Sequence, residues 1–131
     1  MAFPTAVPDG RPIYHTNVLM GIASEYALVC LAAISDERRR DEVARRLGDS
    51  GRTVLDLTFG QVADFAGNTI ELTGSSGRLL ALSQRAAAAL TDEQRAVIEQ
   101  SATLLPLTVP TIEYAGGSVR CMIAGVHLTP R

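Results

Sequence analysis

The feature that most constrains the fold is an order of predicted elements that occurs twice along the chain: two apolar strands, then helix, then a third strand. The first unit has strand patterns at 13–20, 26–33 and 53–58, and a helical pattern at 35–47. The second has strand patterns at 69–73, 78–83 and 104–109, with helical patterns at 84–90 and from 91 onward. This alternation predicts an α/β fold of about two strand-strand-helix-strand modules.

Residue types at the ends of these segments agree with the two-module interpretation. Ser35 is the predicted N-cap of the first helix, and the acidic residues that follow it favour a helix N-terminus. Thr91 and Gln94 have the spacing of a capping box. Pro106 lacks the N–H group that an inner strand needs, so the 104–109 strand is expected at a sheet edge.

Length and charge bound the domain organisation and exclude several classes of protein. The 131 residues fit a single domain, in which 1–11, with two prolines and an Asp-Gly pair, form an irregular lead-in. The 12 basic residues, all Arg, against 14 acidic residues argue against nucleic-acid binding. The absence of Lys excludes Schiff-base and P-loop lysine chemistry. No apolar segment is long enough to span a membrane, so we expect a soluble protein.

The two cysteines, Cys30 and Cys121, lie far apart in the sequence, and nothing like a signal peptide precedes them. We therefore expect reduced thiols in a cytoplasmic protein, with neither a disulfide framework nor a zinc site. Cys30 stands inside an apolar run without a polar neighbour, which predicts a place in the core.

Cys121 follows a Gly-Gly pair in the stretch 115–124 and precedes an apolar run rich in strand formers. This pattern predicts that the thiol lies at the start of a buried strand ending near residue 128. A cysteine in such a place is more often inert than nucleophilic, unless a base adjoins it. His127, six residues further along the same expected strand, would lie about 20 Å away. His15 is therefore the candidate base.

Three separated segments carry a resemblance to a known family. They are Tyr14-His15-Thr16-Asn17-Val18-Leu19-Met20, Phe65-Ala66-Gly67-Asn68 and Gly116-Gly117-Ser118-Val119-Arg120-Cys121-Met122. In this order they resemble the C-terminal part of the amidinotransferase and arginine deiminase superfamily, which has the pentein fold. The resemblance extends from about residue 12 to 128, and is greatest to bacterial amidinotransferase-like proteins that include citrulline-hydrolysing enzymes.

The resemblance implies a role for each of five residues. Cys121 is the expected nucleophile and His15 the expected acid/base. Asn68 is expected to orient His15 or the substrate, and backbone amides around Gly117 and Ser118 to hold a tetrahedral adduct. The implied substrate is a small guanidino or ureido compound, such as citrulline or an arginine derivative, with no cofactor and no metal. Hydrolysis and amidino transfer use the same Cys and His, and hydrolysis is favoured because the resemblance is to the hydrolytic branch.

The chain also departs from the family pattern. Family members are longer, and their N-terminal portion has a Glu-Gly motif whose acidic residue holds the substrate nitrogens; nothing in 1–11 matches it. We therefore expect the C-terminal portion of a pentein, with about two of its five modules. The alternative function is a catalytically incomplete interaction module, which pairs a sheet edge with a separate N-terminal half or forms a homo-oligomer.

Overall fold

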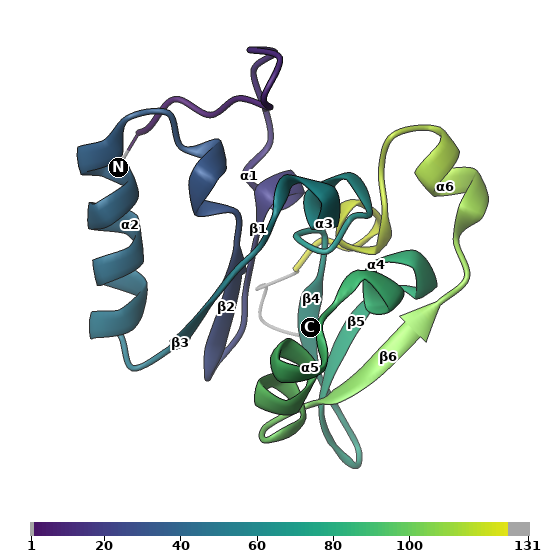
Figure 1. Ribbon diagram of the computed structural model, residues 1–131. Helices are drawn as coiled ribbons and strands as arrows, with labels where there is room; N and C mark the ends of the chain where they lie inside the picture. Colours follow the sequence, from purple (N-terminus) through teal and green to yellow (C-terminus); the bar gives the residue numbers. More distant parts are fainter. Residues whose placement is uncertain (1, 126–131) are drawn as a thin grey trace, which may run out of the picture.

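The computed structural model describes residues 2–125, which fold into two modules side by side (Figure 1). The three-stranded sheet of one module has the order β1-β2-β3, and that of the other has the order β4-β5-β6. In each sheet the first two strands form an antiparallel hairpin, and the third pairs in parallel with the second. Helices make the parallel crossovers, so the two predicted strand-strand-helix-strand modules are present.

The elements follow the chain in the order that the sequence predicts, with a short helical turn before each hairpin. The first module contains α1 (Thr16–Leu19), β1 (Met20–Ile22), β2 (Tyr26–Val29), the 3₁₀ turn η1 (Leu31–Ala33), α2 (Glu37–Asp49) and β3 (Thr53–Asp56). The second contains α3 (Phe59–Ala63), β4 (Ile70–Gly74), β5 (Gly77–Ser83), α4 (Gln84–Ala89), α5 (Asp92–Glu99) and β6 (Thr103–Leu107). The helix α6 (Pro110–Tyr114) and the 3₁₀ turn η2 (Val119–Met122) complete the described chain.

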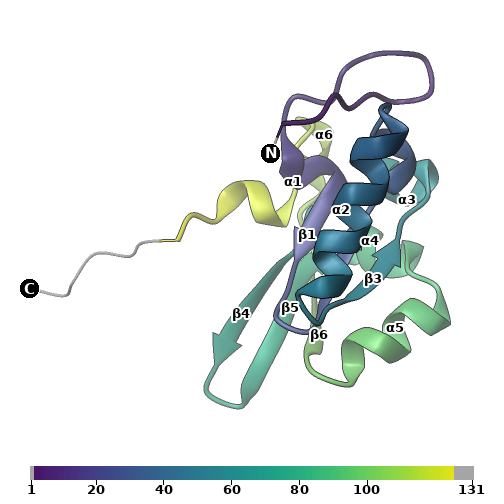
Figure 2. The same ribbon diagram turned by 90° about the vertical axis from the view of Figure 1, so that its left-hand side faces the viewer.

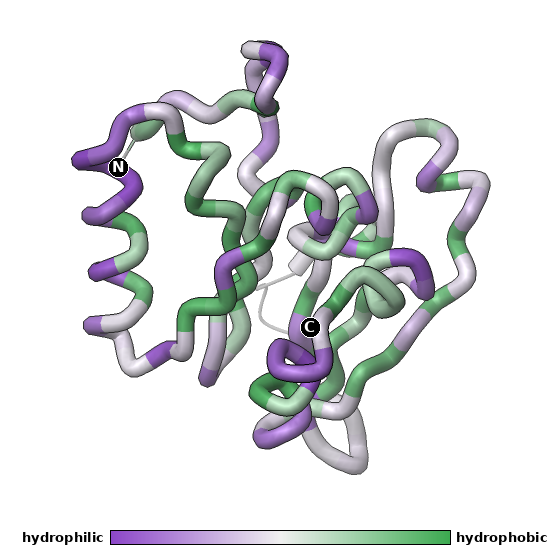
Figure 3. The backbone as a smooth tube through the Cα atoms, viewed as in Figure 1, coloured by the Kyte–Doolittle hydropathy of each residue, from purple (hydrophilic) through white to green (hydrophobic). Residues whose placement is uncertain are grey.

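The core lies between the sheets and the helices that cover them. Every residue of β2 is buried, as expected for a strand covered on both faces. Figure 3 shows the hydrophilic side of α2 turned outward and its hydrophobic side turned toward the strands, where Val43 is buried. Cys30 directly follows β2 and is completely buried, so its predicted place in the core is confirmed.

Of the two predicted helix starts, one is confirmed and one was wrong. Thr91 and Gln94 form the predicted capping box at the start of α5. The N-cap of α2 is Asp36, whose side chain accepts from the N–H of Arg39, and the prediction of Ser35 was wrong. Ser35 instead donates from its backbone N–H to the carbonyl of Pro4, 3.2 Å away, and so connects the lead-in to the module. Pro106 lies in β6 at a sheet edge, as predicted.

Two strand predictions were wrong. The 13–20 segment is a strand only from Met20, because the preceding residues close a helical turn in which the N–H of Val18 donates to the carbonyl of His15. The segment around Cys121 is the 3₁₀ turn η2, in which the N–H of Cys121 donates to the carbonyl of Ser118. The rest of that expected strand, including His127, lies outside the described residues.

The two modules meet where Gly67 passes α1. A Cβ atom at Gly67 would lie 2.6 Å from the carbonyl oxygen of Val18 and 2.8 Å from the carbonyl carbon of Leu19. Only a residue without a side chain allows two backbones to approach this closely. This contact places the residue after it, Asn68, directly beside α1.

Candidate active site

The thiol of Cys121 is exposed and accepts hydrogen bonds from two side-chain amide groups. Nδ2 of Asn68 lies 3.1 Å from Sγ, and Nδ2 of Asn17 lies 3.6 Å from it. Figure 2 shows the chain of η2 passing beside α1, which supplies Asn17. The two amides hold the sulfur in a defined position between α1 and η2, and a positioned, accessible cysteine can act as a nucleophile.

Asn68 is almost completely buried, and its side-chain amide is fully used within the protein. Its NH₂ group donates to Sγ of Cys121 and, over 3.0 Å, to the carbonyl of Asn17. Its Oδ1 accepts from the backbone N–H of Arg120, also at 3.0 Å. Asn68 therefore joins α1 to η2 and fixes the thiol between them, an arrangement that favours orientation of the thiol over direct contact with a substrate.

A tight turn before β4 presents Asn68 in this position. Phe65 has a φ of +64°, a conformation that is uncommon outside glycine. The N–H of Asn68 donates to the carbonyl of Phe65, and the N–H of Ala66 donates to that of Gln61, both at 2.9 Å. Left-handed backbone of this kind at a bulky residue concentrates at functional sites.

His15 lies on the same segment as Asn17, at the start of α1. It is the N-cap residue of that helix, it is exposed, and its side chain makes no capping hydrogen bond. Within residues 2–125, the hydrogen bonds to the Cys121 thiol come from Asn17 and Asn68, and none comes from His15. The structure therefore brings Asn68 and Cys121 together and places His15 on the segment that reaches the thiol, while the pairing of His15 with Cys121 stays a prediction.

Gly117 and Ser118 lead into η2 beside the cysteine. A Cβ atom at Gly117 would lie 3.5 Å from the Cβ of Cys121, so the glycine packs against the candidate nucleophile. Its N–H donates to the carbonyl of Ile112 at 3.2 Å and is thus already engaged. Ser118 is completely buried, and its hydroxyl has no partner among the described residues. The predicted contact of these amides with a reaction adduct stays a prediction.

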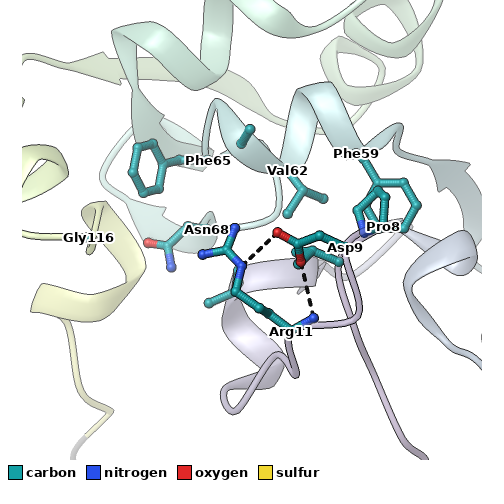
Figure 4. Close-up of a pocket in the computed structure, with 11 residues that line it drawn as sticks. Pro8, Asp9, Arg11, Phe59, Val62, Phe65, Asn68 and Gly116 are labelled. Carbon is teal, nitrogen blue, oxygen red and sulfur yellow. Dashed lines mark hydrogen bonds and ion pairs between the residues drawn. The ribbon is translucent and has the colours of Figure 1, made fainter.

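A pocket of about 450 Å³ opens next to the thiol site and shares Asn68 with it (Figure 4). Its volume falls in the range of about 300–1,000 Å³ that small-molecule sites occupy. Most of its wall is apolar, and its charged groups are Asp9 and Arg11 of the lead-in. The lining residues are Val7, Pro8, Asp9, Arg11, Val18, Phe59, Val62, Ala63, Phe65, Asn68 and Gly116.

The environments of the ionisable groups differ across this region. Burial raises the pKa of the Cys30 thiol, and the nearby Asp56 carboxylate adds to the shift. The backbone N–H and the guanidinium of Arg11 lower the pKa of Asp9.

In the part of the chain that the structure describes, no cluster of three or more His, Cys, Asp or Glu side chains could hold a metal ion. No helix there is long and apolar enough to cross a membrane.

Asn17 is the contact that sequence reasoning did not assign. It belongs to the same segment as His15 and stands two positions after it, so the family resemblance already contained it. Nothing in the sequence around Asn17 indicated a contact with the thiol of Cys121, which lies 104 positions further along the chain.

A comparison with sequence families identifies the family of this chain. The profile described as N,N-dimethylarginine dimethylhydrolase, eukaryotic, matches residues 1–128. The chain belongs to this dimethylhydrolase family. The predicted membership of the pentein amidinotransferase superfamily is thereby confirmed. A search of curated protein sequences found no significant match.

Solved structures share the fold of this dimethylhydrolase-family chain. The arginine dihydrolase ArgZ of cyanobacteria, in its apo form, aligns with a TM-score of 0.67 and 12% identity over 90% of the chain. The N-terminal domain of ArgZ bound to product aligns with a TM-score of 0.60 and 15% identity over 83% of the chain. AgrE in a ternary complex with ornithine and NAD⁺ aligns with a TM-score of 0.62 and 16% identity over 83% of the chain. The matched region spans 17% of the apo ArgZ chain, 36% of the ArgZ N-terminal domain chain and 15% of AgrE.

Proposed function

We propose that this chain carries the nucleophile of a hydrolase that cleaves a C–N bond in the guanidino or ureido group of an arginine derivative. The observation that carries the proposal is the exposed Cys121 thiol, held by two amide donors, one of which, Asn68, also lines a pocket. Membership of a family named for dimethylarginine hydrolysis supports a guanidino compound as the substrate. A cysteine-to-serine mutant of the ArgZ N-terminal domain was captured with its substrate, which is consistent with a cysteine at the centre of that reaction.

The proposed reaction proceeds in two steps. The Cys121 thiolate attacks the central carbon of the guanidino group and forms a C–S bond in a tetrahedral adduct. The adduct collapses when the C–N bond breaks, and His15 gives a proton to the departing amine. Water then adds to the carbon, His15 takes its proton, and the C–S bond breaks to release the ureido product and the thiolate. Asn68 and Asn17 hold the sulfur in place during both steps.

The test is whether the purified chain turns over dimethylarginine, arginine and citrulline. Turnover is measured from the amount of amine or ammonia released. Cys121→Ala is expected to abolish turnover, whereas Cys30→Ala, the matched control, is expected to retain it as long as the protein stays folded. His15→Ala is expected to reduce turnover by about 100-fold or more, the usual contribution of a positioned acid/base. Unchanged turnover in Cys121→Ala would sink the proposal.

A second candidate function is an interaction module, for which the open edge of β3 is the specific observation. Among the described residues β3 pairs with β2 alone, and its four residues contain no proline to block a further strand. The partner would be a separate N-terminal pentein half or a second copy of the chain. Light scattering of the purified protein distinguishes the interaction module from the hydrolase. A protein that is monomeric at all concentrations and that turns over substrate would exclude the interaction module.

A further inference from the structure

A second pocket, of about 430 Å³, lies between the two modules where β2 and β3 begin beside α5 (Figure 1). It shares no described residue with the pocket that Asn68 lines. Each module contributes three polar side chains to its wall. They are Glu25, Tyr26 and Thr53 from the first module, and Arg78, Gln100 and Ser101 from the second.

Two hydroxyl groups of this pocket are buried without a hydrogen-bond partner among the described residues, those of Tyr26 and Ser101. Tyr26 is completely buried. Burial raises the pKa of Tyr26, the carboxylate of Glu71 raises it further, and the guanidinium of Arg78 lowers it. The Tyr26 hydroxyl is therefore within range of the charges at the pocket. A buried hydroxyl without a partner costs free energy, so these two groups mark a place for a polar ligand or a water molecule.

An ion pair across the module boundary brings charges of both signs to the pocket. Nη1 of Arg78, on β5, donates to Oε1 of Glu25, in the turn between β1 and β2, over 3.1 Å. Both side chains stay accessible, with exposed fractions of 41% for Arg78 and 57% for Glu25. Nε and Nη2 of Arg78 and Oε2 of Glu25 have no hydrogen-bond partner among the described residues. The pair can therefore still donate to a carboxylate and accept from an ammonium group.

The balance of charge favours a ligand that carries both signs. Two carboxylates act in this region, those of Glu25 and Glu71, against the one guanidinium of Arg78. A ligand with only negative groups would be repelled by both carboxylates. A ligand with only positive groups would be repelled by Arg78. An α-amino acid has a carboxylate and an ammonium group on one carbon atom, and so can meet both sets of groups at once.

We infer that this pocket binds a free α-amino acid, at a site separate from the Cys121 thiol. Arg78 and the two buried hydroxyls hold the carboxylate, and Glu25 holds the ammonium group. The side chains of Thr53 and Gln100 supply polar contacts to the side chain of the ligand, which favours a polar amino acid such as serine. A bound amino acid contacts both modules and stabilises their packing. The inference does not depend on the proposed function.

Isothermal titration calorimetry of the full chain tests the ligand class with serine and two analogues that each keep one of its charges, 3-hydroxypropionate and ethanolamine. Serine is expected to bind at least about 10-fold more tightly than either analogue, because each lacks one charged, hydrogen-bonded contact. Serine is also expected to raise the urea midpoint of unfolding. No heat and no rise at millimolar serine would overturn the inference, with water as the partner of the hydroxyls. Equal affinity for serine and 3-hydroxypropionate would overturn it as well.

Variants locate the binding in this pocket. Tyr26→Phe keeps the ring that fills the core, and is expected to weaken serine binding by about 10- to 100-fold, the usual worth of a hydrogen bond to a charged group. Glu25→Gln is expected to weaken the binding of serine but not that of 3-hydroxypropionate, which has no ammonium group. Arg38→Ala, at an exposed arginine of α2, is the control and is expected to leave both affinities unchanged. Unchanged serine affinity in Tyr26→Phe and in Glu25→Gln would overturn the assignment of the pocket.

Discussion

The two cysteines of this chain have opposite surroundings. Cys30 is completely buried behind β2, and burial raises the pKa of its thiol, so the reactive thiolate is suppressed. Cys121 is exposed and receives the side-chain amides of Asn17 and Asn68. The chemistry of a cysteine follows from its access to reagent and from the stability of its thiolate, so these two residues should react at very different rates.

We predict that iodoacetamide near neutral pH labels Cys121 at least about 10-fold faster than Cys30 in the folded protein, since only exposed thiols with accessible thiolate react quickly. Peptide mass spectrometry over a time course measures both rates in one sample. On the proposed pairing of His15 with Cys121, His15→Ala is expected to slow the labelling of Cys121 alone, because the variant lacks the base that takes up the thiol proton. Equal rates at the two cysteines would show that the site is not assembled in this chain.

At the scale of elements, the turn before β4 decides whether the site forms. Gly67 lets this turn pass α1 at backbone contact distance, and Asn68 then reaches both the carbonyl of Asn17 and the thiol of Cys121. The three segments of the site belong to different parts of the chain, so their assembly depends on this one close approach.

We predict that Gly67→Ala destabilises the protein by about 2–3 kcal/mol, because the new Cβ would meet backbone atoms of Val18 and Leu19 that cannot move aside. Urea unfolding followed by circular dichroism measures the change. Gly48→Ala is the control: this glycine lies inside α2, a Cβ atom added there would have nothing within 4 Å, and alanine is expected to stabilise by about 0.5–1 kcal/mol. Loss of stability in both variants would indicate that the close approach is not the cause.

At the scale of the whole molecule, polar groups join the two modules at the end of the sheets away from the thiol. Ser24 donates from its hydroxyl and its backbone N–H to Glu71 of β4, and Arg78 of β5 forms an ion pair with Glu25 over 3.1 Å. Tyr26 is completely buried at this junction, and its hydroxyl has no partner among the described residues. Burial, and then the Glu71 carboxylate, raise the pKa of Tyr26.

We predict that the free energy of unfolding decreases as pH rises above about 8.5. The pKa values of Cys30 and Tyr26 are raised in the folded state, so both groups keep their protons there. In the unfolded chain they ionise near their ordinary values of about 8.5 and 10. Their contribution to stability is thus complete below those values and is lost as pH rises through them toward the raised folded values.

Urea titrations at a series of pH values from about 7 to about 10.5 measure this slope. Tyr26→Phe is expected to remove the part of the decrease near pH 10. It is also expected to keep or slightly increase stability at pH 7, because the hydroxyl that it removes has no hydrogen-bond partner among the described residues. A large loss of stability at pH 7 in this variant would mean that the hydroxyl has a partner in solution.

The order of strands and helices was predictable because its causes are local. Periodicity of apolar residues marked both modules, the Thr91–Gln94 capping box began α5, and the apolar neighbours of Cys30 indicated the core. Each of these signals acts within a few residues along the chain. Sequence alone therefore determined the α/β class, the two modules and, through the three segments, the family.

The site was decided by contacts between segments that lie far apart in the sequence. The residues around Cys121 favour a strand by propensity, but the N–H of Arg120 is taken by Asn68, and the chain closes as a 3₁₀ turn that leaves the thiol exposed. Asn17 reaches the same thiol across 104 positions. Only the tertiary structure decided these two contacts and the position of Arg11 over the pocket, because hydrogen bonds between distant segments depend on how the modules pack and leave no period in the sequence.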